Sequence, residues 1–128
     1  MTLETLDPDP NLDTDAFDDD VLAALDAEAY VFHVWGGDWC IDCQEQLPAF
    51  GAALAAAGVP ADRIERYAVS KVDGRKEGPG VEEYDIEFIP TVVVESPDGE
   101  EIVRFVESED VPIATFLADR LAEIETVA

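Results

Sequence analysis

Residues 30–50, YVFHVWGGDWCIDCQEQLPAF, decide the fold. The first part, Tyr30–Trp35, is almost continuously apolar and rich in aromatic and β-branched residues, which predicts a strand buried on both faces, as in a parallel sheet. Two glycines end this strand, and a helix should begin near Cys40. We therefore expect Cys40 and Cys43 at the first turn of a helix that directly follows a buried strand.

Periodicity predicts the elements on either side of this stretch. Helices are expected over about residues 15–29, from Cys40 to about Gly58, over Val81–Tyr84 and from about Pro112 onward, and strands over Tyr67–Val72, Thr91–Ser96 and Glu101–Glu107. The last two strands should form a hairpin around Pro97-Asp98-Gly99. Strands that alternate with helices and end in a hairpin predict an α/β fold. We expect a central mixed sheet of four or five strands, flanked by about four helices on both faces.

The length of 128 residues fits one domain. Residues 1–13 carry Pro8 and Pro10 among acidic residues and are expected to form an acidic leader. Residues 14–128 should form the folded domain.

The chain is strongly acidic, with 31 Asp or Glu against 7 Lys or Arg and a net charge of −24. Residues 1–62 hold 14 of the acids and no Lys or Arg. Such a surface repels itself at low ionic strength and is screened by concentrated salt, which favours a halophilic protein. The alternative is an acidic solvated tail on an ordinary domain. Negative charge also argues against a nucleic acid or an anionic membrane as partner.

The location can be predicted from what the sequence lacks. No apolar run approaches the ~20 residues that span a bilayer, and the N-terminus has no apolar secretory signal. We therefore expect a cytoplasmic protein, where structural disulfides are rare and a lone Cys-x-x-Cys indicates redox or metal chemistry.

The spacing of Cys40 and Cys43 suits redox chemistry. Unpaired N–H groups and the helix dipole favour a thiolate at a helix start, and a thiolate attacks disulfides. Residues three apart share a helical face, so the second sulfur lies within reach of the first and can release a mixed disulfide. Half of a zinc site and two inert thiols are the alternatives, but zinc normally takes four ligands. A redox pair needs no bound cofactor or metal.

The sequence around the two cysteines and a later stretch that contains a proline resemble a known family. Trp39-Cys40-Ile41-Asp42-Cys43 after an apolar strand looks like the active site of thioredoxin-like proteins, and Pro48 falls where that family places a helix-kinking proline. Tyr84-Asp85-Ile86-Glu87-Phe88-Ile89-Pro90-Thr91 resembles the family's Tyr-x-Ile-x-x-Ile-Pro-Thr stretch. The resemblance covers about residues 15–125 and implies a thioredoxin-like fold.

The resemblance also implies a substrate-binding region beside the cysteines. Pro90 would follow a cis peptide bond, and the N–H and C=O of Ile89 would pair with an extended substrate segment. Trp39 would be a docking aromatic, or alternatively a ring at the edge of the core. Lys71 would lie near the buried Cys43, with a plain strand-edge charge as the alternative.

The sequence also departs from the family pattern. Ile41-Asp42 replaces the usual Gly-Pro between the cysteines, and Phe88 replaces a glycine near the docking surface. The family's buried carboxylate aligns with Val34 or, with one extra glycine in the loop, with His33. His33 is either a core histidine with a satisfied ring nitrogen or a buried base that takes the Cys43 proton.

These features predict a protein thiol–disulfide oxidoreductase, acting as a disulfide reductase in a high-salt cytosol. Cys40 is the expected nucleophile and Cys43 the resolving thiol. Asp42 and other nearby carboxylates disfavour the thiolate and so favour a reductant over an oxidant. The expected partners are disulfide-containing proteins and an electron donor of the thioredoxin-reductase type, and the protein should be a monomer. A binding or redox-sensor module without turnover and a zinc-binding module are the alternatives.

Overall fold

The structure, a computed structural model, describes residue 6 and residues 19–25, 30–37, 40–72, 75–78, 80–106 and 113–126. The elements in chain order are α1 (Asp19–Leu25), β1 (Val31–Gly36), α2 (Ile41–Ala57), the 3₁₀ turn η3 (Ala61–Arg63), β2 (Ile64–Ala68), β3 (Ser70–Val72), β4 (Arg75–Glu77), β5 (Thr91–Glu95), β6 (Glu101–Val106) and α3 (Ile113–Thr126). Of the expected leader, only Leu6 falls in these ranges, and its side chain is buried in the core.

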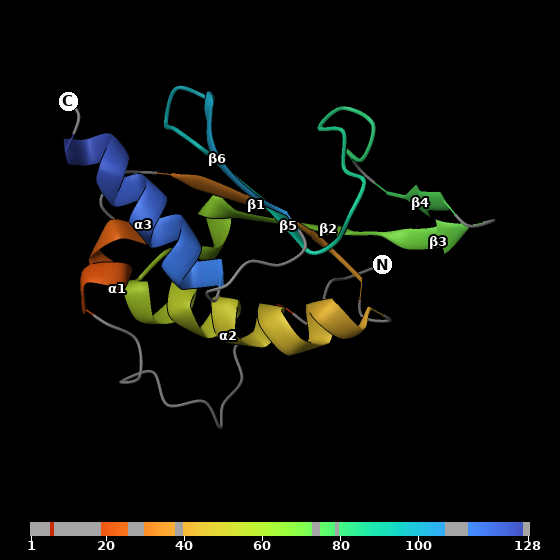
Figure 1. Cartoon of the computed structure of the whole chain (residues 1–128), viewed down its shortest axis with the longest axis horizontal. Coiled ribbons are helices and arrows are strands. Elements are labelled where there is room, and N and C mark those ends of the chain that lie inside the picture. Colours follow the sequence, from red (N-terminus) through yellow and green to blue (C-terminus); the bar gives the residue numbers. More distant parts are fainter. Residues whose placement is uncertain are drawn as a thin grey trace.

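A mixed sheet forms the centre of the molecule (Figure 1). Its four strands run in the order β2-β1-β5-β6, with β1 parallel to β2 and antiparallel to β5, and with β5 antiparallel to β6. Strands β3 and β4 form a separate two-stranded sheet. The predicted α/β class and the mixed sheet are therefore confirmed.

The three α-helices pack against one another and lie together on one face of the sheet (Figure 1). Phe32 of β1 meets Phe50 of α2 with ring centroids 6.3 Å apart, and Phe105 of β6 meets Phe116 of α3 at 5.3 Å. The prediction that helices cover both faces is wrong for the described residues. A loop over Gly80–Asp85 lies on the opposite face, where its Tyr84 ring packs on Trp35.

This loop replaces the helix that the sequence predicts at Val81–Tyr84. The Tyr84 N–H donates to the Gly80 carbonyl at 2.9 Å, so one helical turn forms, but it is not continued. Gly80 and Asp85 at its two ends have φ angles of 75° and 54°. Left-handed residues of this kind interrupt a right-handed helix, so the segment forms successive turns.

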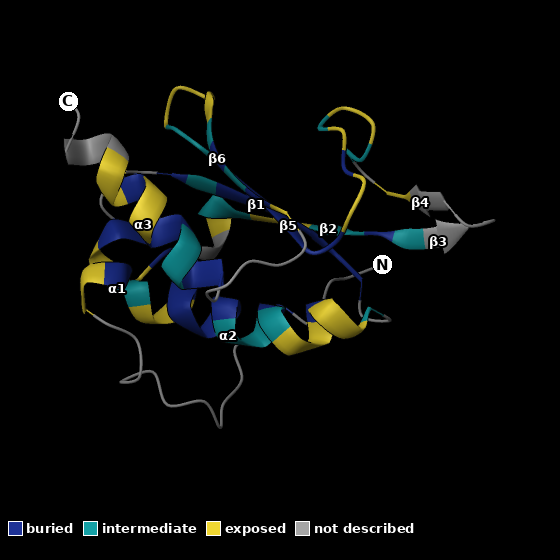
Figure 2. Ribbon diagram, viewed as in Figure 1, coloured by how far each residue is buried: buried dark blue, intermediate teal, exposed yellow. Residues whose placement is uncertain are grey.

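Most of the core comes from positions that the sequence pattern marks as apolar (Figure 2). Helix α2 ends as predicted, because Gly58 has φ 83° and its N–H donates to the Ala55 carbonyl. The strand predicted at Tyr67–Val72 instead begins at Ile64 and is interrupted at Val69. The interruption falls where the pairing partner changes: the Val69 N–H donates to the carbonyl of Gly36, the last residue of β1, at 2.8 Å, and Ser70–Val72 then pair with β4.

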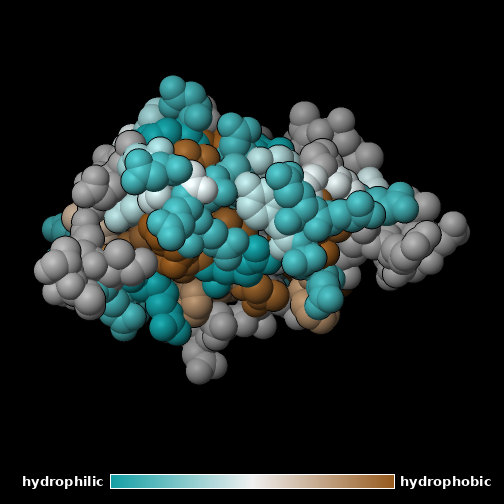
Figure 3. All heavy atoms as spheres, turned by 90° about the horizontal axis from the view of Figure 1, so that it is seen from above, coloured by the Kyte–Doolittle hydropathy of each residue, from teal (hydrophilic) through white to brown (hydrophobic). Residues whose placement is uncertain are grey.

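On the face seen in Figure 3, hydrophilic residues cover much of the coloured surface, with hydrophobic residues showing between them. Among the helices that the structure describes, none combines the length and the apolar character needed to cross a bilayer.

Candidate redox site

The two cysteines lie where β1 gives way to α2. Cys40 is the N-cap of α2, with an extended backbone at φ −88° and ψ 123°. Its Sγ accepts the Cys43 N–H at 3.4 Å, and its own N–H donates to the Gly37 carbonyl at 3.0 Å. A side chain that accepts a helix-start N–H satisfies one of the unpaired donors there. A negatively charged Sγ would strengthen this bond, so the geometry favours Cys40 as the reactive sulfur.

The two thiols differ in burial. Both are free thiols in the structure, but Cys40 is half-buried whereas Cys43 is fully buried. Burial is the main cause that raises the pKa of Cys43 to about 12, and the adjacent Cys40 and Asp42 contribute in the same direction. Cys43 therefore stays protonated at neutral pH and cannot compete as the first nucleophile.

The segment Phe88–Pro90 lies next to Cys40. The Ile89–Pro90 peptide bond is cis, as the family resemblance implies. The Cys40 thiol donates to the Ile89 carbonyl at 3.9 Å, and the Thr91 hydroxyl donates to the Phe88 carbonyl at 2.6 Å. Ile89 and Pro90 are both buried, so pairing of the Ile89 backbone with a substrate segment stays a prediction.

His33 lies in a separate polar network, on the sheet face opposite α2. Its Nε2 is 2.7 Å from a carboxylate oxygen of Glu95, and its Nδ1 is 2.8 Å from the Tyr67 hydroxyl. A carboxylate only accepts, so Nε2 donates to Glu95 and a neutral ring accepts the Tyr67 O–H at Nδ1. Both ring nitrogens thus have partners in the core, while proton transfer from Cys43 to His33 stays a prediction.

The same network holds the Gly80–Asp85 loop. The Tyr84 hydroxyl donates to the second oxygen of Glu95 at 3.1 Å, and the Tyr84 carbonyl accepts Arg104 Nη1 at 2.7 Å. Burial and the bond to Glu95 raise the pKa of Tyr84 to about 12. Trp35 stacks on Tyr67 at a centroid distance of 4.5 Å and contacts the tilted ring of Tyr84 at 4.8 Å. The loop that leads to Phe88 is therefore fixed to the sheet by aromatic and polar contacts.

Of the other predicted site residues, the structure describes some side chains and not others. Asp42 is exposed in the first turn of α2, beside both cysteines. Lys71 lies in β3, but its side chain is outside the described part of the structure, and so is all of Trp39. Their roles at the site stay predictions.

Tyr67, Tyr84 and Glu95 were not predicted to act together. The sequence carries one weak signal for them, a histidine in an apolar strand, which needs polar partners when it is buried. The partners come from β2, β5 and the loop, 34 and 62 residues away from His33 in the case of Tyr67 and Glu95. Sequence spacing alone cannot identify partners at such separations.

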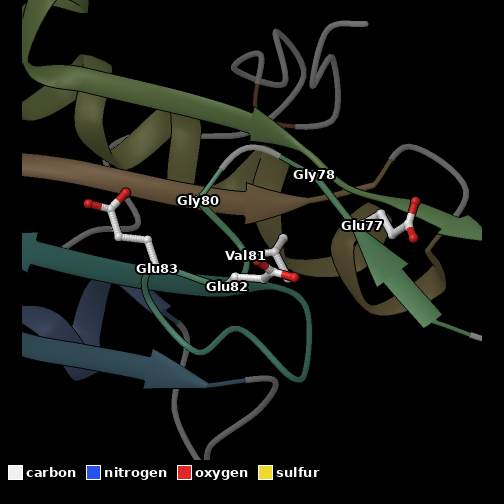
Figure 4. Close-up of a pocket in the computed structure, with 6 residues that line it drawn as sticks. All are labelled: Glu77, Gly78, Gly80, Val81, Glu82 and Glu83. Carbon is white, nitrogen blue, oxygen red and sulfur yellow. The ribbon is translucent and has the colours of Figure 1, made fainter.

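A cavity of about 440 Å³ lies away from the cysteines, between the end of β4 and the loop (Figure 4). Its lining includes the exposed carboxylates of Glu77, Glu82 and Glu83. In Figure 4 the carboxylates of Glu77 and Glu83 lie at opposite ends of the cavity. Among the described residues no group of three or more His, Cys, Asp or Glu side chains is arranged to hold a metal ion.

Comparison with known proteins gives matches among solved structures. No protein-family model and no curated protein matches the sequence. A protein of unknown function from Pseudomonas aeruginosa is 24% identical, with a TM-score of 0.56 over 90% of this chain and 78% of that one. An HIV epitope scaffold is 23% identical, with a TM-score of 0.57 over the same shares. At these identities the likeness concerns the fold, and the chain has a thioredoxin-like fold with a Cys-x-x-Cys pair at the start of α2.

Proposed function

We propose that the protein is a protein thiol–disulfide oxidoreductase that works as a disulfide reductase. The observation that carries this proposal is the asymmetry of the two thiols. Cys40 is half-buried and accepts a helix-start N–H, whereas Cys43 is buried, protonated and one helical turn away. A reductase of this kind needs one accessible nucleophile and one protected thiol that acts second.

The reaction runs in two exchanges. The Cys40 thiolate attacks one sulfur of a substrate disulfide, so that a Cys40–substrate disulfide forms and the other substrate sulfur leaves as a thiolate. Cys43 then attacks Cys40 Sγ, and its proton passes to the second substrate sulfur, which leaves as a thiol. The substrate gains two electrons, and the protein is left with a Cys40–Cys43 disulfide. An external dithiol, such as that of a thioredoxin-reductase-type donor, must reduce this disulfide before the next cycle.

Substituting each cysteine by serine tests this order. Cys43→Ser should accumulate a mixed disulfide with substrate proteins, because no second thiol releases it, and Cys40→Ser should form none. Both variants should lose turnover of a generic disulfide with dithiothreitol as reductant. The measurement is non-reducing electrophoresis with mass spectrometry of the trapped species. Equal trapping by both variants would refute the assignment, and wild-type protein without turnover would favour a binding or sensor module.

The reducing direction is supported by charge near the pair. Asp42 and Glu45 are exposed in the first turns of α2, and Asp42 is one of the groups that raise the pKa of Cys43 and so disfavour its thiolate. Strong oxidants of this fold stabilise the reduced form and have potentials near −120 mV, against about −270 mV for thioredoxin. We expect a potential at or below about −220 mV. Equilibration with dithiothreitol in molar KCl measures it, and a value above roughly −180 mV would contradict the reducing role.

The acidic composition supports the proposed setting. A net charge of −24 on 128 residues suits a salt-rich cytoplasm, where screening weakens the self-repulsion. The same charge makes protein substrates more suitable partners than nucleic acids or anionic membranes. We propose that a single chain carries out the reaction, because both cysteines come from one helix start.

A further inference from the structure

Four rings pack together on the sheet face opposite the helices. Trp35 stacks on Tyr67, with ring centroids 4.5 Å apart and an angle of 14° between the ring planes. Centroid distances of 5.7 and 5.6 Å join the His33 ring to those of Tyr67 and Tyr84. Tryptophan and tyrosine are among the side chains that lose one electron most readily, and stacked rings let an electron pass between them. The proposed thiol–disulfide exchange uses none of these rings.

The phenol of Tyr67 has a base in line with its proton. Its hydroxyl donates to Nδ1 of His33 at 2.8 Å, because Nε2 of the same imidazole donates to Glu95 at 2.7 Å. Loss of one electron makes a phenol strongly acidic, so oxidation is much easier when an imidazole accepts the proton in the same step. Burial and the charges of nearby carboxylates raise the pKa of Tyr67, so the phenol still carries this proton at neutral pH.

Carboxylates around the pair stabilise the positive charge that the proton would bring to the imidazole. Glu95 accepts directly from His33, and a hydrogen bond of this kind becomes stronger when the donor is charged. Glu65 and Glu83 add negative charge near Tyr67. The Tyr67 side chain is half-buried, so an oxidant in solution can reach it.

Tyr84 has a poorer proton acceptor than Tyr67. The Tyr84 hydroxyl donates to Glu95 at 3.1 Å, and this carboxylate already accepts from His33. Carboxylates are also weaker bases than imidazole. Tyr67 is therefore the tyrosine whose oxidation the network favours.

We propose that Tyr67 is a redox-active tyrosine that captures one-electron oxidants, an activity separate from the two-electron exchange at the cysteines. The oxidant takes one electron from Tyr67, the phenol O–H bond breaks, and the proton forms an N–H bond at Nδ1 of His33. The products are the reduced oxidant, a neutral tyrosyl radical and an imidazolium held by Glu95. One electron from an external reductant and the proton from His33 then restore the phenol. Tyr67 thereby offers one-electron oxidants a target other than Cys40.

Laser-flash oxidation of the full chain tests this activity. Cys40→Ala with Cys43→Ala gives a background in which no thiol competes, since the chain has two cysteines. The oxidant is tris(bipyridine)ruthenium(III), which the flash generates with a cobalt(III) ammine as electron acceptor. We expect a tyrosyl radical, identified by its absorption and electron paramagnetic resonance spectra. It should form more slowly in heavy water, because the O–H bond of Tyr67 breaks in the same step.

Single substitutions in this background assign the radical. Tyr67→Phe should lose most of the tyrosyl signal. Tyr84→Phe is the matched control and should keep it, because the Tyr84 hydroxyl donates to Glu95. His33→Gln leaves Tyr67 a hydrogen-bond acceptor but no base, so the radical should form more slowly and without the effect of heavy water. The isotope effect in the intact network needs no such variant and decides the question even if His33→Gln does not fold.

Three results would overturn the inference. The first is a tyrosyl signal that survives in Tyr67→Phe, and the second is a radical on Trp35 in place of tyrosine. The third is an equal rate of radical formation in ordinary and heavy water, because His33 would then not take the proton during oxidation. Since this background has no cysteine, none of these results bears on the proposed thiol–disulfide exchange.

Discussion

Iodoacetamide should alkylate Cys40 at least about a hundredfold faster than Cys43 in the reduced, folded protein at pH 7.5. A pKa of about 12 in place of 9.0 leaves about a thousandfold less Cys43 thiolate at this pH, and burial also blocks the reagent. The two rates can be followed by quenching with acid, digesting the protein and measuring the labelled peptides by mass spectrometry.

The pH dependence of the labelling rate gives a stricter test of this expectation. Because the pKa of Cys43 is about 12, its labelling should remain slow up to pH 9. In concentrated denaturant the burial is lost, so the two cysteines should react at similar rates. Equal labelling of both cysteines in the folded protein would show that Cys43 is not protected, and the order of attack would then have no structural basis.

The elements that the sequence predicts well are those governed by local interactions. The start of α2 follows a buried strand and two glycines, and its end at Gly58 has a left-handed C-cap. The hairpin around Pro97-Asp98-Gly99 also forms, with Gly99 at φ 87° and its N–H donating to the Ser96 carbonyl. Because Cys40 and Cys43 lie at one of these locally determined ends, their positions could be predicted as well.

The errors concern segments whose conformation depends on distant residues. The loop at Val81–Tyr84 has a helix-like pattern, but Tyr84 is bound by Trp35, Glu95 and Arg104 from the sheet. Without these contacts in view, the sequence favours a helix and predicts helices on both faces. The same holds for His33, since a buried histidine shows that partners exist but does not identify them.

Glu95 bonds two side chains at once, and its loss should be costly. Its two oxygens hold His33 and Tyr84 at 2.7 and 3.1 Å, and the side chains of His33 and Glu95 are only 10% and 17% exposed. Removing one partner from a buried pair leaves the other polar groups unsatisfied. We therefore expect Glu95→Ala to lower the free energy of unfolding by about 2–4 kcal/mol.

Two further variants show whether the stability loss comes from this network or from the removal of a negative charge in general. Glu95→Gln keeps the shape, and its amide can still bond His33 and Tyr84, so we expect a loss of only about 1 kcal/mol. Glu123→Ala removes a carboxylate that lies 3.9 Å from Arg120 on the exposed face of α3, and this change should cost less than about 0.5 kcal/mol. Denaturant unfolding in molar KCl gives all three values on one scale.

The pKa of Tyr84 in the loop gives a second measure of this network, and a simple packing defect would not change it. The Tyr84 pKa of about 12 depends on burial and on the bond to Glu95, so Glu95→Gln should bring it closer to 10.0. Ultraviolet titration of tyrosinate measures this change. If Glu95→Ala is as stable as Glu123→Ala and the tyrosine titration is unchanged, Glu95 does not hold the loop. Phe88 and Ile89 would then owe their position beside Cys40 to other contacts, such as the Thr91 bond to the Phe88 carbonyl.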